Sequence, residues 1–180
     1  MTRCPTIETE RLGLRPFREE DLDAYTAILQ APEVRYWLRI REDVGREQAW
    51  QAMVNMLGQW ELRNTGNWAI EERSTGELVG RAGSYRPERG DWPGIEIGWT
   101  LHPQHWGKGY ATEAGAVARD WVFANHDVDA VYSCILHENV ASQSVAKRLG
   151  FTYWEDRTFA HYPSEPHGIW RLRRADYDAT

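Results

Sequence analysis

GIEIGWTLHPQHWGKGYATEAGAVARDWVFA, residues 94–124, is a stretch in which the hydrophobic period changes partway along. From Ile95 to Leu101 every second residue is hydrophobic, which is the pattern of a half-buried strand. A loop with two glycines follows, and from Tyr110 onward the hydrophobic residues recur at helical spacing. The stretch therefore predicts a strand that runs through a glycine loop into a helix.

A glycine loop that precedes a helix has the chemistry of an anion site. The first turn of a helix leaves backbone N–H groups without partners and carries a partial positive charge, so it attracts phosphates. Gly107 and Gly109 have no Cβ, which lets the N–H groups of the loop converge on one ligand. Loops before helices also carry glycine for turn geometry alone, so the rest of the chain must decide.

The composition predicts one globular domain over residues 1–180. The chain is 42% hydrophobic and 27% charged, which is ordinary for a domain with a real core, and its ten tryptophans favour aromatic walls around a cleft. A net charge of −6 argues against nucleic acid as a partner. No hydrophobic run has the length of a signal peptide or a membrane span, so we expect a cytoplasmic protein with no membrane partner.

The remaining chain alternates between strand and helix patterns. Seven segments read as strands: 12–17, 68–71, 78–85, 95–101, 130–136, 151–158 and 168–173. Four read as helices: 18–29, 46–63, 110–124 and 142–149. Residues 34–40 give no clear prediction, and residues 160–167 read as a loop. The expected fold is α/β, with a mixed, mostly antiparallel sheet of about seven strands flanked by about four helices.

Two motifs and the order of the elements resemble the GCN5-related N-acetyltransferase (GNAT) superfamily, and within it the group that acetylates the N-termini of ribosomal proteins. The acetyl-CoA signature of that family, Gln/Arg-x-x-Gly-x-Gly/Ala, matches residues 104–109, Gln-His-Trp-Gly-Lys-Gly. A second signature, Asn-x-x-Ser followed by Leu-Gly-Phe, matches Asn139, Ser142 and residues 149–151. The resemblance begins at residues 9–17, TERLGLRPF, so it covers nearly the whole chain.

The resemblance implies that the strand at 95–101 splays from the strand at 130–136 and leaves a V-shaped gap for the pantetheine arm of acetyl-CoA. Unpaired backbone groups of the first strand would bond the pantetheine amides like an added strand. The loop N–H groups would hold the pyrophosphate, with Lys108 adding charge at the edge. The cofactor-binding residues implied in this way are Trp99, Thr100, Leu101, Gln104, His105, Trp106, Gly107, Lys108, Gly109, Tyr110, Ala111, Asn139 and Ser142.

Acetyl transfer to an amine also needs a base for the amine and an acid for the leaving thiolate. Glu96 is our candidate base, because alternation puts it on the polar face of the strand, where a partly dry cleft would raise its pKa. Half of every such strand faces polar surroundings in any case. Ser142 matches the position of the acid in the ribosomal-protein group, although Ser is also a preferred helix cap. The Tyr found in most of the superfamily is replaced by Ala146, which leaves Ser142 or water as the donor.

Other polar and aromatic residues have weaker signals. Residues 106–114, WGKGYATEA, resemble the extended motif of the ribosomal-protein group, and Glu113 is part of it. We interpret Glu113 as stabilising the helix or bonding the loop, since a carboxylate would repel a pyrophosphate. His102 and His105 have no further ligand nearby in sequence, so no metal is expected. Four aromatic residues are expected to line the acceptor pocket, although core packing explains each equally well: Trp37, Trp60, Trp92 and Tyr162.

We therefore expect an acetyl-CoA-dependent N-acetyltransferase that acts on a primary amine, either a protein N-terminus or a small molecule such as an aminoglycoside or polyamine. The alternative from another class is a non-catalytic acyl-CoA sensor or interaction module on the same fold, which only Ala146 supports. A P-loop phosphotransferase is excluded, because no Gly-x4-Gly-Lys-Ser/Thr motif is present. The acceptor and the oligomeric state stay open, with a homodimer as one option.

Overall fold

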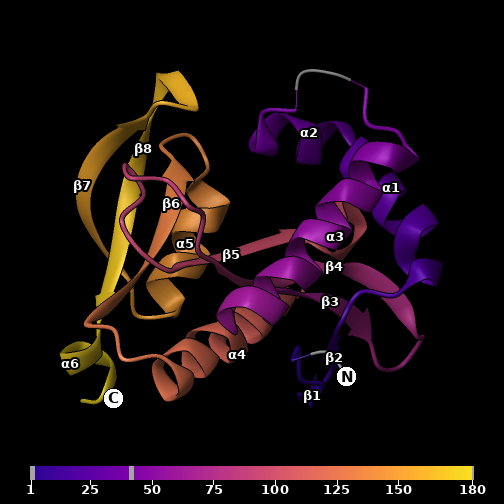
Figure 1. Cartoon of the computed structure of the whole chain (residues 1–180), viewed down its shortest axis with the longest axis horizontal. Helices are drawn as coiled ribbons and strands as arrows, with labels where there is room; N and C mark the ends of the chain where they lie inside the picture. Colours follow the sequence, from indigo (N-terminus) through magenta and orange to yellow (C-terminus); the bar gives the residue numbers. More distant parts are fainter. Residues whose placement is uncertain (1–2, 41–42, 180) are drawn as a thin grey trace.

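The computed structural model describes residues 3–40 and 43–179, and over these residues it has one eight-stranded sheet and six α-helices (Figure 1). The sheet has the order β1-β2-β3-β4-β5-β6-β8-β7. The first half of the chain forms β1 (Ile7–Glu8), β2 (Leu12–Arg15), α1 (Leu22–Gln30), α2 (Pro32–Leu38), α3 (Arg46–Arg63), β3 (Asn67–Glu72) and β4 (Glu77–Tyr85). The second half forms β5 (Glu96–Leu101), α4 (Tyr110–Asn125), β6 (Ala130–Leu136), α5 (Val140–Arg148), β7 (Thr152–Phe159), β8 (Tyr162–Arg173) and α6 (Arg174–Tyr177).

The mixed, mostly antiparallel α/β fold predicted from the sequence is confirmed, with small differences in the number of elements. The structure adds the short β1 and α6, and it adds α2 in a region for which the residue pattern supports no clear prediction. Pro32 occupies the first turn of α2, where its missing N–H costs nothing. None of the described helices is both long and hydrophobic enough to cross a lipid bilayer.

The predicted loop at residues 160–167 is wrong, because β8 already begins at Tyr162. Backbone pairing extends β8 along both of its neighbours, with His167 opposite Leu136 of β6 and Arg157 of β7. This segment is mostly polar and contains proline, so its sequence lacks the alternation of hydrophobic residues that predicts a strand. The early part of β8 pairs with β7 alone, from Tyr162 opposite Phe159, and pairing with β6 begins at His167, so the hairpin with β7 supplies the stabilisation that the side chains do not signal.

The strands β5 and β6 meet at one end and then separate. β5 pairs with β4 along its whole length, from Glu96 opposite Tyr85 to Leu101 opposite Gly80. With β6 it makes a parallel pair only at Glu96 and Tyr132. Figure 1 shows β5 running away from β6 beyond this point. The sheet therefore opens between its fifth and sixth strands, β5 and β6, as the resemblance implied.

The hydrophobic core has two parts on the two faces of the sheet. One part surrounds α4, which contacts β2, β4 and β5. The other lies between the sheet and the helices α1, α2 and α3. The two packed layers hold β4 and β5 rigidly, so the open edge of β5 has a fixed position relative to the start of α4.

Candidate active site

A cavity of about 1200 Å³ lies where β5 and β6 separate. This volume is larger than the roughly 300–1,000 Å³ of an ordinary small-molecule pocket, so the cavity has room for two ligands. Its lining comes from β4, β5 and the start of α4, from β6 and α5, and from α1, α2, α3 and β8. The gap in the sheet and the space under the N-terminal helices are thus one continuous site.

The backbone of β5 offers hydrogen-bonding groups to this cavity. The N–H of Tyr132 donates to the Ile95 carbonyl at 3.0 Å, which fixes the side of β5 that faces β6. Because backbone groups alternate along a strand, those of Trp99 and Leu101 point to the same side, and those of Thr100 point to β4. The Leu101 carbonyl accepts a hydrogen bond from the Trp106 indole at 2.9 Å. Trp99 is therefore the main backbone partner that β5 presents in the gap.

The glycine loop adopts the conformation that its sequence predicts. Gly107 has φ +75° and Gly109 has φ +84°, values that favour glycine, and α4 begins directly afterwards at Tyr110. Within the described first turn, the N–H groups of Thr112 and Glu113 donate to the Gly109 carbonyl, each at 3.1 Å. The preceding N–H groups of the turn are the ones that a helix start leaves for an anion.

Most of the predicted cofactor-binding residues line the cavity, and two do not. Gln104 is exposed on the short helix Pro103–His105, outside the cavity lining. The Nζ atom of Lys108 lies 3.3 Å from Nδ1 of His105 and 5.6 Å from the centre of the Tyr110 ring. Lys108 itself is exposed and outside the lining, although both of the residues that it contacts, His105 and Tyr110, belong to the lining.

Glu113 bonds the N-terminal segment across the glycine loop. It accepts hydrogen bonds from the Thr9 hydroxyl at 2.6 Å and from Nε of Arg11 at 2.8 Å. Burial alone would raise the pKa of Glu113, but these hydrogen bonds lower it below the usual value. Nη1 of Arg11 also donates to the Lys108 carbonyl at 2.7 Å. The interpretation of Glu113 as a bond to the loop is thus supported, through Arg11, whose role in the site the sequence analysis did not foresee.

Glu96 lies in the cavity wall at the end of β5 that meets β6. Its carboxylate accepts a hydrogen bond from the N–H of Cys134 at 3.3 Å. Burial raises the pKa of Glu96 to about 7, although the Cys134 N–H and the nearby Arg81 and Arg89 oppose the shift. A carboxyl group with this pKa exchanges a proton at neutral pH, as a general base must.

Asn139 and Ser142 lie on the opposite wall, at the start of α5. Oδ1 of Asn139 accepts the N–H of Ser142 at 3.0 Å, so Asn139 is the cap of this helix and Ser142 is not. This corrects the interpretation of Ser142 as a cap. The Ser142 side chain is half-buried and lines the cavity, and its hydroxyl donates to no described residue in the way that Ser144 donates to Val140.

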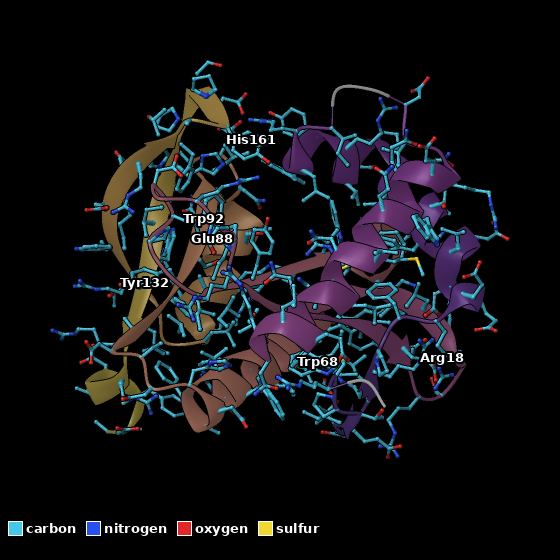
Figure 2. All side chains as sticks on the ribbon, in the orientation of Figure 1. Arg18, Trp68, Glu88, Trp92, Tyr132 and His161 are labelled. Atoms are coloured by element: carbon cyan, nitrogen blue, oxygen red, sulfur yellow. The ribbon has the colours of Figure 1, made fainter. Side chains whose placement is uncertain are left out.

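Three of the four aromatic residues predicted for the acceptor pocket line the cavity: Trp37, Trp92 and Tyr162. Trp92 lies in the loop between β4 and β5 (Figure 2), where its ring stacks on Phe159 at 4.4 Å. Trp60 does not line the cavity, which corrects that prediction. It is fully buried, its ring centre lies 4.5 Å from that of Trp68, and its indole donates to the Asn67 carbonyl. The side of α3 that carries Trp60 packs into the core.

Several arginines of the lining were not predicted as site residues from the sequence, because they lie in segments that share no motif. Arg81 comes from β4, Arg89 from the following loop and Arg148 from the end of α5. Arg39 follows α2 and bonds Glu138 and Glu165, each at 2.7 Å, across the cavity end. Folding places these arginines in the lining of one cavity, and no local sequence motif predicts them.

Comparisons with known proteins agree with this geometry. A family model described as an acetyltransferase (GNAT) domain matches residues 11–152. An uncharacterized N-acetyltransferase, p20 of Bacillus licheniformis, is 30% identical over 147 residues, which are 81% of this chain and 82% of the relative.

Solved structures share the fold over nearly the whole chain. An acetyltransferase from Agrobacterium tumefaciens is 29% identical with a TM-score of 0.80, covering 94% of this chain and 95% of its own. The aminoglycoside acetyltransferase AAC(6′)-Ib, solved in complex with coenzyme A, has a TM-score of 0.71 at 21% identity, covering 94% of this chain and 98% of its own.

Proposed function

The chain belongs to the GNAT acetyltransferase family, and on that premise we propose that it transfers an acetyl group from acetyl-CoA to a primary amine in a ternary complex. One observation carries the proposal. A single cavity joins the glycine loop, the gap between β5 and β6, and Glu96. A thioester bound in the gap and an amine entering from the side of α1 and α2 would meet beside that carboxyl group.

The residues of the gap fit acetyl-CoA. A Cβ added at Gly107 would meet nothing within 4 Å, so the loop leaves open space where a pyrophosphate can approach the N–H groups at the start of α4. The backbone of Trp99 is free to pair with an amide of the pantetheine arm. Acetyl-CoA supplies a thioester carbonyl that an amine attacks. Arg148, exposed on α5 and in the cavity lining, would add charge for the phosphates.

The proton transfers are assigned to two residues on opposite walls. Glu96, with a pKa near 7, would accept the amine proton directly or through water. Ser142, whose hydroxyl lines the cavity, would donate to the departing thiolate. Ala146 is fully buried and lies outside the cavity lining, so it takes no part. A protein N-terminus is one acceptor class, because residues 106–114, WGKGYATEA, resemble the motif of the group that acetylates ribosomal proteins.

Acetylation of an amine panel tests the proposed function. Acetyl-CoA is first titrated into the protein by calorimetry, and N-terminal peptides, aminoglycosides, polyamines and amino acids are then screened for acetylated product and free thiol. Binding followed by acetylation of at least one amine supports the proposal. Absence of acetyl-CoA binding at high micromolar concentration overturns it, and binding without any transfer favours the non-catalytic sensor.

Replacing Ser142 by Ala is expected to lower kcat by about tenfold to a hundredfold, because the thiolate then depends on water for its proton. The Kd for acetyl-CoA should stay within about twofold, since α5 keeps its Asn139 cap. Ser144→Ala is the matched control, because the Ser144 hydroxyl is already bonded to the Val140 carbonyl. Unchanged kcat in the Ser142 variant would remove Ser142 from the mechanism.

Arg11→Gln is expected to weaken acetyl-CoA binding by about tenfold, because the Glu113 carboxylate then faces the pyrophosphate without its cation. Removing that carboxylate as well should restore part of the affinity, so the double variant with Glu113→Gln binds better than Arg11→Gln alone. Arg73→Gln, which removes an arginine paired with Glu8 outside the cavity, is the control. Calorimetry measures the Kd for acetyl-CoA of the native protein, Arg11→Gln, Glu113→Gln, the double variant and the control. If the losses of affinity of the two single variants add up in the double variant, this role of Arg11 is contradicted.

A further inference from the structure

Two arginines at the acceptor end of the cavity have no carboxylate partner. Among the residues that the structure describes, Arg81 and Arg89 line the cavity and take part in no ion pair. The neighbouring Arg15, in contrast, lies 2.7 Å from Asp21 and 2.9 Å from Glu71. Burying a guanidinium without a counter-ion costs free energy, so we expect the counter-ion of these two cations to come from a ligand.

The known contacts of the two arginines are neutral. Nη1 of Arg81 donates to Oδ1 of Asn67 at 2.9 Å, and Arg81 also bonds the Tyr25 hydroxyl. Arg89 lies over the Trp92 ring, with its guanidinium carbon 5.5 Å from the ring centre. A guanidinium has five N–H donors, so each side chain keeps donors for a ligand.

The described acids near this end form no ion pair with Arg81 or Arg89. The cavity lining contains two acids, Glu96 and Glu113, and Glu113 is held by Arg11 at the other end. Glu96 is protonated for much of the time at neutral pH, because burial raises its pKa to about 7. Arg39 is paired with two carboxylates, Glu138 and Glu165, so this cluster carries one negative charge and leaves none of its cations for a ligand.

His167 also faces this end, where burial lowers its pKa and favours the uncharged ring. It therefore adds no charge of either sign near pH 7. Among the charged side chains described at this end, Arg81 and Arg89 are thus the cations of the lining that are in no ion pair, and both act on the carboxyl group of Glu96, which faces the amine.

The face of β5 between Arg81 and Glu96 has open space above Gly98. Arg81 lies opposite Thr100 in the β4–β5 pair, and Thr100, Gly98 and Glu96 share one face of β5. A Cβ added at Gly98 would meet nothing within 4 Å, so no side chain blocks the path along this face. Four residues of strand span about 13 Å, the length of one small molecule or peptide end that has its amine at Glu96 and a second group toward Arg81. Arg89, in the loop after β4, acts on Glu96 as well.

We propose that the acceptor is an amine that also carries an anionic group, a carboxylate or a phosphate, which Arg81 and Arg89 bind while the amine faces Glu96. This inference rests on the proposed acetyl transfer and narrows its substrate class. It selects amino acids, their derivatives and acidic peptide ends over polycationic acceptors such as aminoglycosides and polyamines, because a polycation would meet two unneutralised arginines.

Binding of matched ligand pairs to the CoA-loaded protein tests the inference without relying on turnover. The pairs are phenylalanine with phenylalaninamide, β-alanine with its amide, and phosphoethanolamine with ethanolamine, with spermidine as the polycation. Quenching of tryptophan fluorescence reports binding, since Trp37 and Trp92 line the cavity. At least one anionic member is expected to bind about tenfold tighter than its neutral partner, and spermidine weakest. The pair that shows the larger preference identifies carboxylate or phosphate as the anion.

Arginine variants connect that preference to the two side chains. Arg81→Gln and Arg89→Gln should each reduce it to below about threefold, and Arg81→Lys should keep most of it because the charge remains. Arg86→Gln, an exposed arginine of the same loop outside the cavity lining, is the control and should change nothing. Equal affinity within every pair, including no binding by any ligand, overturns the inference, as does a preference that survives both Gln variants. Failure of the proposed function would appear separately, as no acetylation of any amine by acetyl-CoA.

Discussion

Glu96→Gln is expected to lower kcat by about 10²–10⁴-fold while the Kd for acetyl-CoA stays within about twofold. The amide keeps the shape of the carboxyl group and its place beside the Cys134 N–H, but it cannot accept the proton of the attacking amine. Because burial raises the pKa of Glu96 to about 7, kcat of the native protein should rise with pH and reach a plateau above that value.

A pH profile of kcat for the native protein and the variant measures both effects. The residual activity of Glu96→Gln should lack the step near pH 7 that the native protein shows. Glu113→Gln serves as a control for charge removal elsewhere in the cavity, since it should alter acetyl-CoA binding and leave the pH step intact. A native profile without the step, or a variant with native kcat, would show that Glu96 is not the base.

The same substitution should change stability with pH in a defined direction. Between its ordinary pKa of 4.5 and its folded value of about 7, Glu96 binds more protons in the folded state than in the unfolded state. Its contribution to the free energy of unfolding therefore falls as pH rises through this window. Glu96→Gln should be more stable than the native protein above pH 7 and lose that advantage near pH 4, which thermal melts across pH measure.

Gly107→Asp is expected to weaken acetyl-CoA binding by about a hundredfold or more, because it adds a negative charge where the loop should hold the pyrophosphate. Gly107→Asn is the matched control, since both residues tolerate the left-handed backbone that φ +75° requires. The Asn variant should lose less than about tenfold in affinity.

Calorimetry with acetyl-CoA distinguishes the two Gly107 variants, and thermal melts check that both fold alike. The difference in acetyl-CoA affinity between Gly107→Asp and Gly107→Asn should become smaller as the salt concentration is raised, because salt screens an exposed charge on the loop. Equal affinity of the two variants would mean that the pyrophosphate does not approach this loop. The anion site would then have to lie elsewhere in the cavity.

Sequence patterns worked best where one element carries its own signal. The strand at Ala130–Leu136 and the helix at Arg46–Arg63 were predicted with their observed limits, because each has a continuous hydrophobic period. Patterns failed where stability comes from partners. β8 extends through a polar segment because β7 pairs with it there, and Trp60 faces the core because the side of α3 that bears it packs on β3.

The sequence alone determined the strand, glycine loop and helix at residues 94–124, and with them the expectation of an anion site at the helix start and of Glu96 on the strand before it, because strand period, glycine and helix start are local properties. Only the tertiary structure decided what surrounds that carboxyl group. Arg81 and Arg89 belong to different segments, a strand and the loop after it, and share no motif. Arg11 and Glu113 are far apart in the chain, and the separation of β5 from β6 depends on which distant strands pair. Charge balance and desolvation depend on distances through space, which the order of residues does not record.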